Sequence, residues 1–222
     1  MAMNYRHTFY DGKESPLPVG KVVCVGRNYH DHIKELNNPV PATPMFFIKP
    51  ATSLVPIHQR IVIPSYSDNC HHETELAVLI GKDLTRASLS EAESAIAGFA
   101  IALDLTLRDV QQRLKEKGHP WEIAKGFDGA CPISPFLERE RLKDPQDTRL
   151  KLMVNGKTRQ DETTKLMITK ILDLLSIASS YFTLKAGDIF LTGTPGGVKQ
   201  LRSGDRLELE LAGRYRFNTS VR

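Results

Sequence analysis

The pattern of hydrophobic and polar positions predicts two kinds of strand. Residues 71–81 read His-His-Glu-Thr-Glu-Leu-Ala-Val-Leu-Ile-Gly, so that polar residues open the segment and five apolar residues follow before the glycine. An apolar run of this length predicts a strand that enters a buried core. Residues 206–211 instead alternate leucine with charged residues, which predicts a strand with one solvated face. Residues 215–221 are expected to pair with that strand across Ala212-Gly213.

Shorter apolar segments predict further strands and a few helices. We expect strands at 21–25, 46–50, 61–64, 99–105, 150–154, 157–160 and 188–191, and helices at 30–36, 88–96, 108–117 and 164–182. Ser88-x-x-Glu91 is a helix-start signal, and Asn155-Gly156 predicts a type I′ hairpin turn. Because strands and helices do not alternate regularly, the pattern predicts an α+β protein built on mixed sheet and not a doubly wound sheet.

Length and composition restrict the class of protein. A chain of 222 residues suits one domain with a sizeable core, and we expect an extended lead-in at 1–19 followed by a single domain at 20–222. The net charge of +4, with no basic run, argues against nucleic-acid binding. No apolar stretch is long enough to predict a membrane span or a signal peptide. Three widely spaced cysteines, at 24, 70 and 131, predict reduced thiols and a cytoplasmic location.

Acids at the entrance of the buried strand are the first candidate site. Alternate residues of a strand share a face, so His71, Glu73 and Glu75 are expected to point the same way. Two carboxylates about 7 Å apart on one face repel each other, and a hard divalent cation such as Mg²⁺ or Mn²⁺ relieves that repulsion. The alternative is a solvated strand end whose acids pair with lysines. Zinc at Cys70-His71 is less favoured, because no second Cys or His lies at finger spacing.

Two further charged residues lie in apolar or uncharged surroundings. Asp104 ends an apolar strand, where an acid is costly unless it is paired or bound. We therefore expect it to join the other carboxylates, or else to cap the strand or pair with Arg108. Lys125 lies beside a glycine among uncharged residues, which indicates an inward-facing side chain or one whose stem alone is buried.

Several short motifs occur in a fixed order along the chain. They are Gly26-Arg27-Asn28-Tyr29 with His32-x-x-Glu35, Phe47-Ile48-Lys49-Pro50, His71-x-Glu73-x-Glu75-Leu76, Asp104 with Arg108-Asp109-x-Gln111, Lys125-Gly126-Phe127-Asp128 and Thr192-Gly193-Thr194-Pro195-Gly196. The ordered set resembles the fumarylacetoacetate hydrolase family over roughly residues 20–212, and within it the short acylpyruvase-type branch. The resemblance implies a mixed β-sandwich roll with a few flanking helices, and a homodimer.

The resemblance also implies a site and its residues. A Mg²⁺ or Mn²⁺ ion is expected on Glu73, Glu75 and Asp104. A small oxo acid is expected to bind Arg27, Arg108, Gln111, Lys125 and Thr194. His32 and Glu35 resemble the family's water-activating pair, on a segment that closes as a lid. Their i, i+3 spacing places both side chains on one helix face, which suits a base and the group that orients it. Without the resemblance the pair would read as a solvated helix face.

Departures from the family pattern reduce the range of substrates that we expect. Members that cleave fumarylacetoacetate carry a further acid where this chain has residues 25–27 and a glutamate where it has 196–199, so fumarylacetoacetate itself is a poor candidate. We expect an enzyme that converts a 2-oxo or 2,4-dioxo acid through a metal-bound enolate, with Lys125 stabilising the anion.

Several net reactions could share this intermediate. Acylpyruvate hydrolysis to pyruvate and a carboxylate, with water activated by His32 and Glu35, is the main hypothesis. Oxaloacetate tautomerisation and oxaloacetate decarboxylation at the same site are the alternatives. A protein that binds oxo acids without turnover is a further reading.

Overall fold

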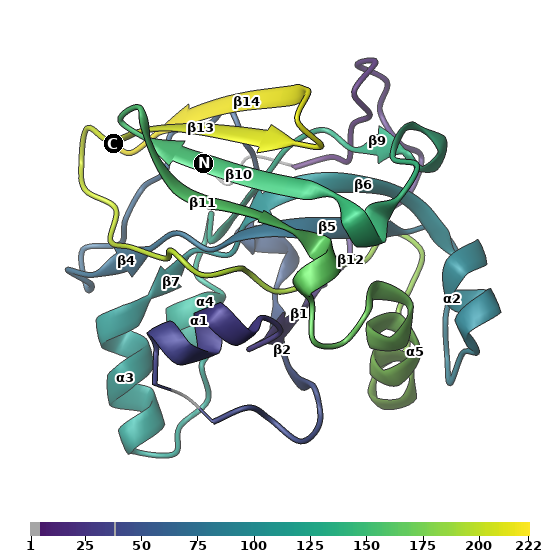
Figure 1. Ribbon diagram of the computed structural model, residues 1–222, viewed down its shortest axis with the longest axis horizontal. Coiled ribbons are helices and arrows are strands. Elements are labelled where there is room, and N and C mark those ends of the chain that lie inside the picture. Colours follow the sequence, from purple (N-terminus) through teal and green to yellow (C-terminus); the bar gives the residue numbers. More distant parts are fainter. Residues whose placement is uncertain (1–4, 38) are drawn as a thin grey trace.

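Two sheets packed face to face form the body of the protein (Figure 1). The computed structural model describes residues 5–37 and 39–222. The larger sheet has the order β2-β1-β12-β5-β6-β8-β3, with β9 paired to β6. Its strands are β1 (Val22–Gly26), β2 (Met45–Lys49), β3 (Leu54–Pro56), β5 (Thr74–Ile80), β6 (Ile96–Leu103), β8 (Cys131–Ile133), β9 (Leu137–Glu138) and β12 (Ile189–Leu191). Parallel pairs (β1 with β12, β3 with β8) occur among antiparallel ones, so the sheet is mixed.

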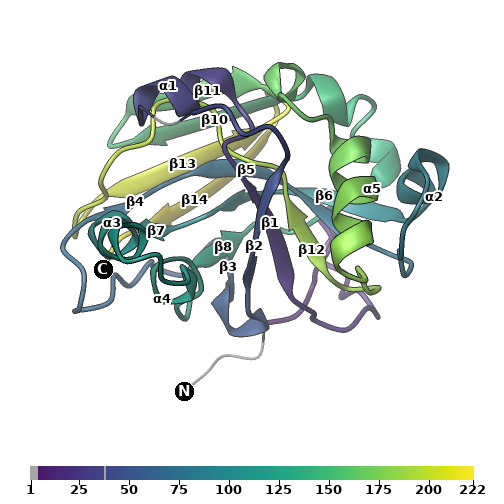
Figure 2. The same cartoon turned by 90° about the horizontal axis from the view of Figure 1, so that it is seen from below.

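The smaller sheet covers one face of the larger. Its order is β11-β10-β13-β14. The strands are β10 (Arg149–Val154), β11 (Lys157–Thr163), β13 (Arg206–Leu211) and β14 (Tyr215–Ser220), and a separate ribbon joins β4 (Cys70–His71) to β7 (Thr106–Leu107). Figure 2 shows the strands of the larger sheet fanning out beneath the smaller one.

Helices flank the two sheets at opposite ends (Figures 1 and 2). They are α1 (His30–Glu35), α2 (Leu89–Ser94), α3 (Arg108–Glu116), α4 (Glu122–Lys125) and α5 (Ile171–Tyr181), with 3-10 turns η1 (Ala51–Ser53), η2 (Arg139–Arg141), η3 (Pro145–Asp147) and η4 (Thr164–Leu166). At one end α2 packs near α5, and at the other α1, α3 and α4 gather around the start of β5. None of the helices in the described parts of the chain is long and apolar enough to cross a bilayer. This architecture confirms the predicted α+β class with mixed sheet.

Strand β5 lies at the centre of the hydrophobic core. Every residue from Thr74 to Ile80 is buried. Leu76 faces the core between the two sheets, whereas Ala77 and Leu79 face a second apolar cluster on the other side of the larger sheet. Because both faces of β5 are covered, its sequence is continuously apolar. In β13 the leucines are buried and Glu208 is exposed, which explains the strict alternation there.

Most of the predicted elements are confirmed, but two strand predictions were wrong in detail. The segment 71–81 is not one strand: β4 ends at His71 and β5 begins at Thr74. The predicted strand at 61–64 is absent from the described structure except for an isolated bridge between Ile61 and Val221. Pro64 has no amide hydrogen for a ladder, which limits pairing in this segment.

The helix predicted for 164–182 begins only at Ile171. Residues 164–166 form a 3-10 turn, and the following backbone is bound by Asn28 from the end of β1. The Asn28 side chain accepts the Thr169 N–H at 2.8 Å and donates to the Thr169 carbonyl at 3.0 Å. These tertiary contacts override the helical spacing of the apolar residues. The short elements α4 and β8 were missed, because β8 contains a proline and α4 is a single turn.

The predicted lead-in, where described, packs against the larger sheet; residues 1–4 lie outside the described residues. His7 is buried, and its Nε2 lies 2.9 Å from the carbonyl oxygen of Gly187 and 3.2 Å from that of Pro18. Gly187 has a φ of +94°, and a Cβ added there would lie 1.9 Å from the Pro18 oxygen. The turn before β12 therefore depends on glycine for both its backbone conformation and its close approach to the first segment.

Substitution of Gly187 tests this close approach. We expect Gly187→Ala to lower the free energy of unfolding by more than about 2 kcal/mol, because a left-handed conformation costs an L-residue about 1–2 kcal/mol and the backbone overlap adds to it. Gly213→Ala is the matched control, since Gly213 has a φ of +71° but open space around a Cβ. Urea denaturation measures both variants. Equal losses would show that the first segment does not remain against Gly187.

Candidate active site

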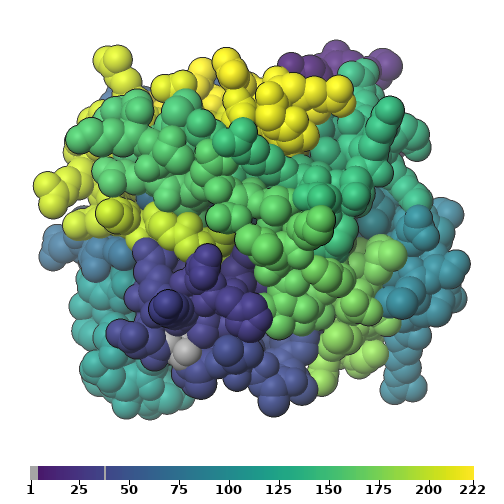
Figure 3. Space-filling model, viewed as in Figure 1, coloured from purple at the N-terminus to yellow at the C-terminus, as the bar shows by residue number. Residues whose placement is uncertain are grey.

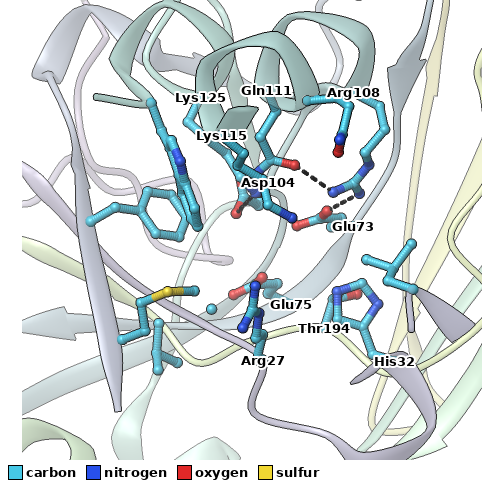
Figure 4. A pocket seen from close by; sticks show the side chains of 17 residues that line it. Arg27, His32, Glu73, Glu75, Asp104, Arg108, Gln111, Lys115, Lys125 and Thr194 are labelled. Atoms are coloured by element: carbon cyan, nitrogen blue, oxygen red, sulfur yellow. Dashed lines mark hydrogen bonds and ion pairs between the residues drawn. The ribbon is translucent and has the colours of Figure 1, made fainter. Parts of the chain in front are cut away.

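A cavity of about 120 Å³ lies between the start of β5, the end of β1 and helices α1, α3 and α4. Figure 4 shows the charged side chains that converge in it. Nine of the ten predicted site residues line the cavity, namely Arg27, His32, Glu73, Glu75, Asp104, Arg108, Gln111, Lys125 and Thr194. Glu35 is the exception. The sequence motifs, which are spread over the chain, therefore meet at one place in the fold.

The pairing of β5 with β6 brings three carboxylates together. Thr74 pairs with Leu103, and the Asp104 N–H donates to the Glu73 carbonyl at 2.8 Å. Glu73, Glu75 and Asp104 are all buried, and one oxygen from each can be chosen so that the three lie within 4.8 Å of one another. Cys70 and His71 join no such cluster among the described residues, so the zinc alternative finds no support.

Two buried lysines compensate this negative charge. Lys125 Nζ lies 2.8 Å from Glu73 Oε2 and 2.7 Å from Asp104 Oδ2. Lys49 Nζ lies 2.8 Å from Asp104 Oδ1 and also donates to the backbone carbonyls of Leu105, Lys125 and Ala130. Lys49 thus has no donor left for a ligand, whereas Lys125 has one N–H that no described oxygen accepts. Asp104 is not paired with Arg108, because Arg108 binds Glu73.

Glu73 and Glu75 differ sharply in their protonation. Burial raises the pKa of Glu73, but the charges of Lys125 and Arg108 outweigh it and hold that pKa well below its usual range. Glu75 has no such partner, and its carboxylate accepts only the Gly193 N–H, at 2.6 Å, within the described contacts. Burial and the neighbouring charges of Asp104 and Glu73 raise the pKa of Glu75 well above its usual value. Its surroundings therefore favour the protonated form of Glu75.

A divalent cation fits this set of residues. Three hard carboxylate oxygens at this spacing suit Mg²⁺ or Mn²⁺. A dication would replace the proton on Glu75 and supply the positive charge that this residue lacks. The alternative prediction was that the acids pair with lysines. Glu73 and Asp104 do pair with Lys125, but this alternative does not explain why Glu75 is buried beside two other acids without a lysine partner among the described residues.

Helix α3 forms a cationic wall of the cavity. Arg108, Gln111 and Lys115 recur at i, i+3 and i+7, so one helix face presents all three. Arg108 Nη1 donates to Gln111 Oε1 at 2.9 Å. Arg27, with a left-handed φ of 60°, faces this helix across the cavity in Figure 4. The pKa of Lys115 is lowered by burial and by the nearby charges of Arg27 and Arg108. Such a group of cations suits an anionic ligand.

His32 and Glu35 are not joined by a hydrogen bond in the described structure. His32 is buried against the cavity, burial lowers its pKa, and its Nδ1 has no hydrogen-bond partner among the described residues. The Glu35 carboxylate instead accepts the N–H groups of Gly197 and Val198 at 3.0 and 3.4 Å. Figure 3 shows the α1 segment (dark blue) filling the surface below the loop that contains these two residues. The two side chains therefore diverge despite their shared helix.

Three polar residues near the cavity were not predicted. Lys49, like Asp104, is a charge at the end of an apolar strand, but it was not assigned to the site. Lys115 becomes recognisable only when helix α3 is placed beside the acids. Gln160 of β11 contacts Thr194 without lining the cavity itself. Nothing in the sequence around Gln160 distinguishes it from a solvated strand residue.

Comparisons of the sequence and of the structure with known proteins point to the same family. Residues 21–222 match the family described as fumarylacetoacetate (FAA) hydrolase, C-terminal. The chain is 52% identical to oxaloacetate tautomerase YcgM of Escherichia coli (strain K12), over 94% of this chain and 96% of that protein. It is 43% identical to the mitochondrial oxaloacetate tautomerase FAHD1 of Homo sapiens, over 86% of this chain and 87% of that protein. Among solved structures, fumarylpyruvate hydrolase from Pseudomonas aeruginosa in complex with Mn²⁺ and pyruvate superimposes with a TM-score of 0.92, at 36% identity, over 98% of this chain and 95% of that one.

Replacing the unpaired carboxyl tests the metal site. Because the pKa of Glu75 is raised in the folded protein, this group destabilises the metal-free fold as the pH rises from the usual value of 4.5 toward the folded pKa. We expect Glu75→Gln to raise the melting temperature of metal-free protein at pH 7 and to abolish the further rise that Mg²⁺ produces in the parent. Differential scanning calorimetry measures both effects. Glu208→Gln, at an exposed position, is the control, and a retained Mg²⁺ response in Glu75→Gln would contradict the assignment.

Proposed function

The chain belongs to the fumarylacetoacetate hydrolase family, and from this premise we propose that it is a divalent-metal-dependent oxaloacetate tautomerase, which interconverts the enol and keto forms of oxaloacetate. The curated relatives named above carry this activity in their names and match most of the chain. They favour the tautomerase alternative over acylpyruvate hydrolysis, the main hypothesis from the sequence.

The separation of His32 from Glu35 is the observation in the site that carries this proposal. Tautomerisation moves one proton between the C2 oxygen and C3, so it needs one base and no activated water. His32 supplies a neutral imidazole, because burial lowers its pKa, and its side chain lines the cavity. Hydrolysis would require Glu35 to leave Gly197 and Val198 and turn toward His32.

The remaining groups suit a small dicarboxylic acid. The cavity of about 120 Å³ is smaller than the roughly 300–1,000 Å³ typical of sites for drug-sized ligands. Arg27, Arg108 and Lys115 offer positive charge to its carboxylates, and the remaining N–H of Lys125 stabilises negative charge on the C2 oxygen. Mg²⁺ or Mn²⁺ held by the three carboxylates would supply Lewis-acid stabilisation of the same charge.

Acylpyruvate hydrolysis is the second candidate. It is supported by the likeness to the Pseudomonas aeruginosa fumarylpyruvate hydrolase. Oxaloacetate decarboxylation would use the same groups, with CO₂ lost from C4. A binding protein without turnover explains neither the buried base nor the lysine in the cavity. The homodimer and the cytoplasmic location stay predictions.

Two substitutions in α1 distinguish tautomerisation from hydrolysis. We expect His32→Gln to lower kcat for ketonisation of enol-oxaloacetate about 10²–10⁴-fold, because the proton carrier is removed. Glu35→Gln should lower it by about tenfold or less, since it weakens only two backbone contacts. Stopped-flow absorbance of the enol measures both, with the exposed His58→Gln as control. Equal losses at both positions, together with release of acetate from acetylpyruvate, would favour the hydrolase.

The pH dependence follows from the state of His32. A base works in its neutral form, so kcat/KM for ketonisation should fall as the pH falls through the folded pKa of His32, which lies below the usual 6.5. The profile is measured with saturating Mg²⁺, so that protonation of the carboxylates does not limit it. The residual activity of His32→Gln should lack this acid limb. An acid limb that persists unchanged in the variant would exclude His32 as the titrating base.

A further inference from the structure

Thr194 lines the cavity, and the hydrogen of its hydroxyl is already committed. Its Oγ1 is 3.0 Å from the Thr74 carbonyl oxygen, which can only accept, so the single hydroxyl hydrogen points there. The same Oγ1 lies 2.7 Å from Gln160 Nε2, which donates to it. A hydroxyl has one hydrogen and two lone pairs, and these two contacts use the hydrogen and one lone pair. What remains for a ligand is one lone pair.

The direction of these hydrogen bonds depends on how the Gln160 amide is oriented. Gln160 Oε1 accepts the Thr74 N–H at 3.0 Å, and Nε2 donates to the Pro195 carbonyl at 3.0 Å. Backbone groups cannot exchange donor and acceptor roles, so a flipped amide would place oxygen against oxygen and N–H against N–H. His72 Nδ1, 3.1 Å from Oε1, is a second donor to the same oxygen. The orientation of the amide is therefore determined from both ends.

Burial makes this arrangement costly to reverse. The exposed fractions are 1% for His72, 1% for Gln160 and 3% for Thr194. Water cannot replace a partner here, and an unsatisfied buried donor or acceptor is strongly unfavourable. Gln160 does not line the cavity itself, so its effect on a ligand passes through Thr194.

We propose that Thr194 is a hydrogen-bond acceptor toward the cavity, because the Thr74 carbonyl takes its hydroxyl hydrogen, and that Gln160 is a positioning residue that holds this hydroxyl in place, so that Thr194 binds the hydroxyl of an enol and not a carboxylate. The identification of that hydroxyl as the enol of oxaloacetate rests on the proposed function. Carboxylates, which only accept, are bound by the cationic side chains Arg27, Arg108 and Lys115. In Figure 4, Thr194 and His32 lie across the cavity from Arg108 and Gln111, so the two classes of contact are separated in space.

A pair of ligands that differ only at C2 tests the proposal. Lactate carries a hydroxyl at C2, whereas pyruvate carries a keto oxygen that can only accept. With Mg²⁺-loaded protein and isothermal titration calorimetry, we expect Thr194→Val to weaken the better-bound enantiomer of lactate about fivefold to tenfold and to change pyruvate by less than about twofold. Thr194→Ser keeps the hydroxyl and should restore the affinity for lactate. A loss for pyruvate as large as that for lactate, or no loss for either, would overturn the proposal.

The positioning role of Gln160 has its own test. Gln160→Met removes the N–H that holds the Thr194 hydroxyl in position, and it should lower the ratio of lactate to pyruvate affinity in the same direction as Thr194→Val, but by less, because the Thr74 carbonyl still takes the hydroxyl hydrogen. A purely structural role would weaken both ligands alike and would overturn this part. Should Gln160→Met fail to fold, the Thr194→Val and Thr194→Ser pair still decides whether Thr194 is an acceptor. These experiments measure binding, whereas the oxaloacetate assay measures turnover. Either the role of Thr194 and Gln160 or the proposed function can therefore be contradicted while the other is supported.

Discussion

The structure depends on the compensation of charge inside the core. Glu73, Glu75 and Asp104 are buried where the two sheets and α3 meet, and each ionised carboxylate there needs a cation within hydrogen-bond distance. Lys125 and Lys49 supply two such cations. A buried ion pair adds little net stability over an apolar pair, but removal of one partner is strongly destabilising. The cluster therefore adds little to stability, and the surrounding fold must hold its members in place.

The larger sheet holds the members of the carboxylate cluster in place. The register of β5 against β6 sets Glu73 beside Asp104, and a slip of one residue would turn Glu75 to the opposite face. Such a slip is prevented because β5 is buried on both faces. Lys49 extends the same constraint to the helical side, since it binds Asp104 and also the backbone carbonyl of Lys125 at the end of α4. One buried ammonium thus ties the strand side of the site to the helix side.

The site residues that could be predicted from the sequence are polar residues that stand beside apolar runs. Glu75 and Asp104 stand out because they lie at the start and at the end of apolar runs, and the ordered motifs then identified the family. Gln160 could not be found in this way, because its role depends on which strand lies behind Thr194, and that is set by the packing of the two sheets. The helix boundary at Ile171 was mispredicted for a related reason, since Asn28, more than a hundred residues earlier, binds the backbone before it. Contacts between distant segments leave no periodic signal.

Helix α1 differs from the rest of the cavity wall in what holds it. It has six residues and no side-chain hydrogen bond at its N-cap, and a helix this short is not stable by itself in water. The Glu35 carboxylate binds it to Gly197 and Val198, while Ile33 is buried beneath it. Local unfolding begins where the fewest contacts must break, so α1 should open long before β5 does. His32 is thereby carried on the wall that opens most readily and the carboxylates on the part that opens last, so that opening of the cavity and disruption of the carboxylate cluster are governed by different free energies.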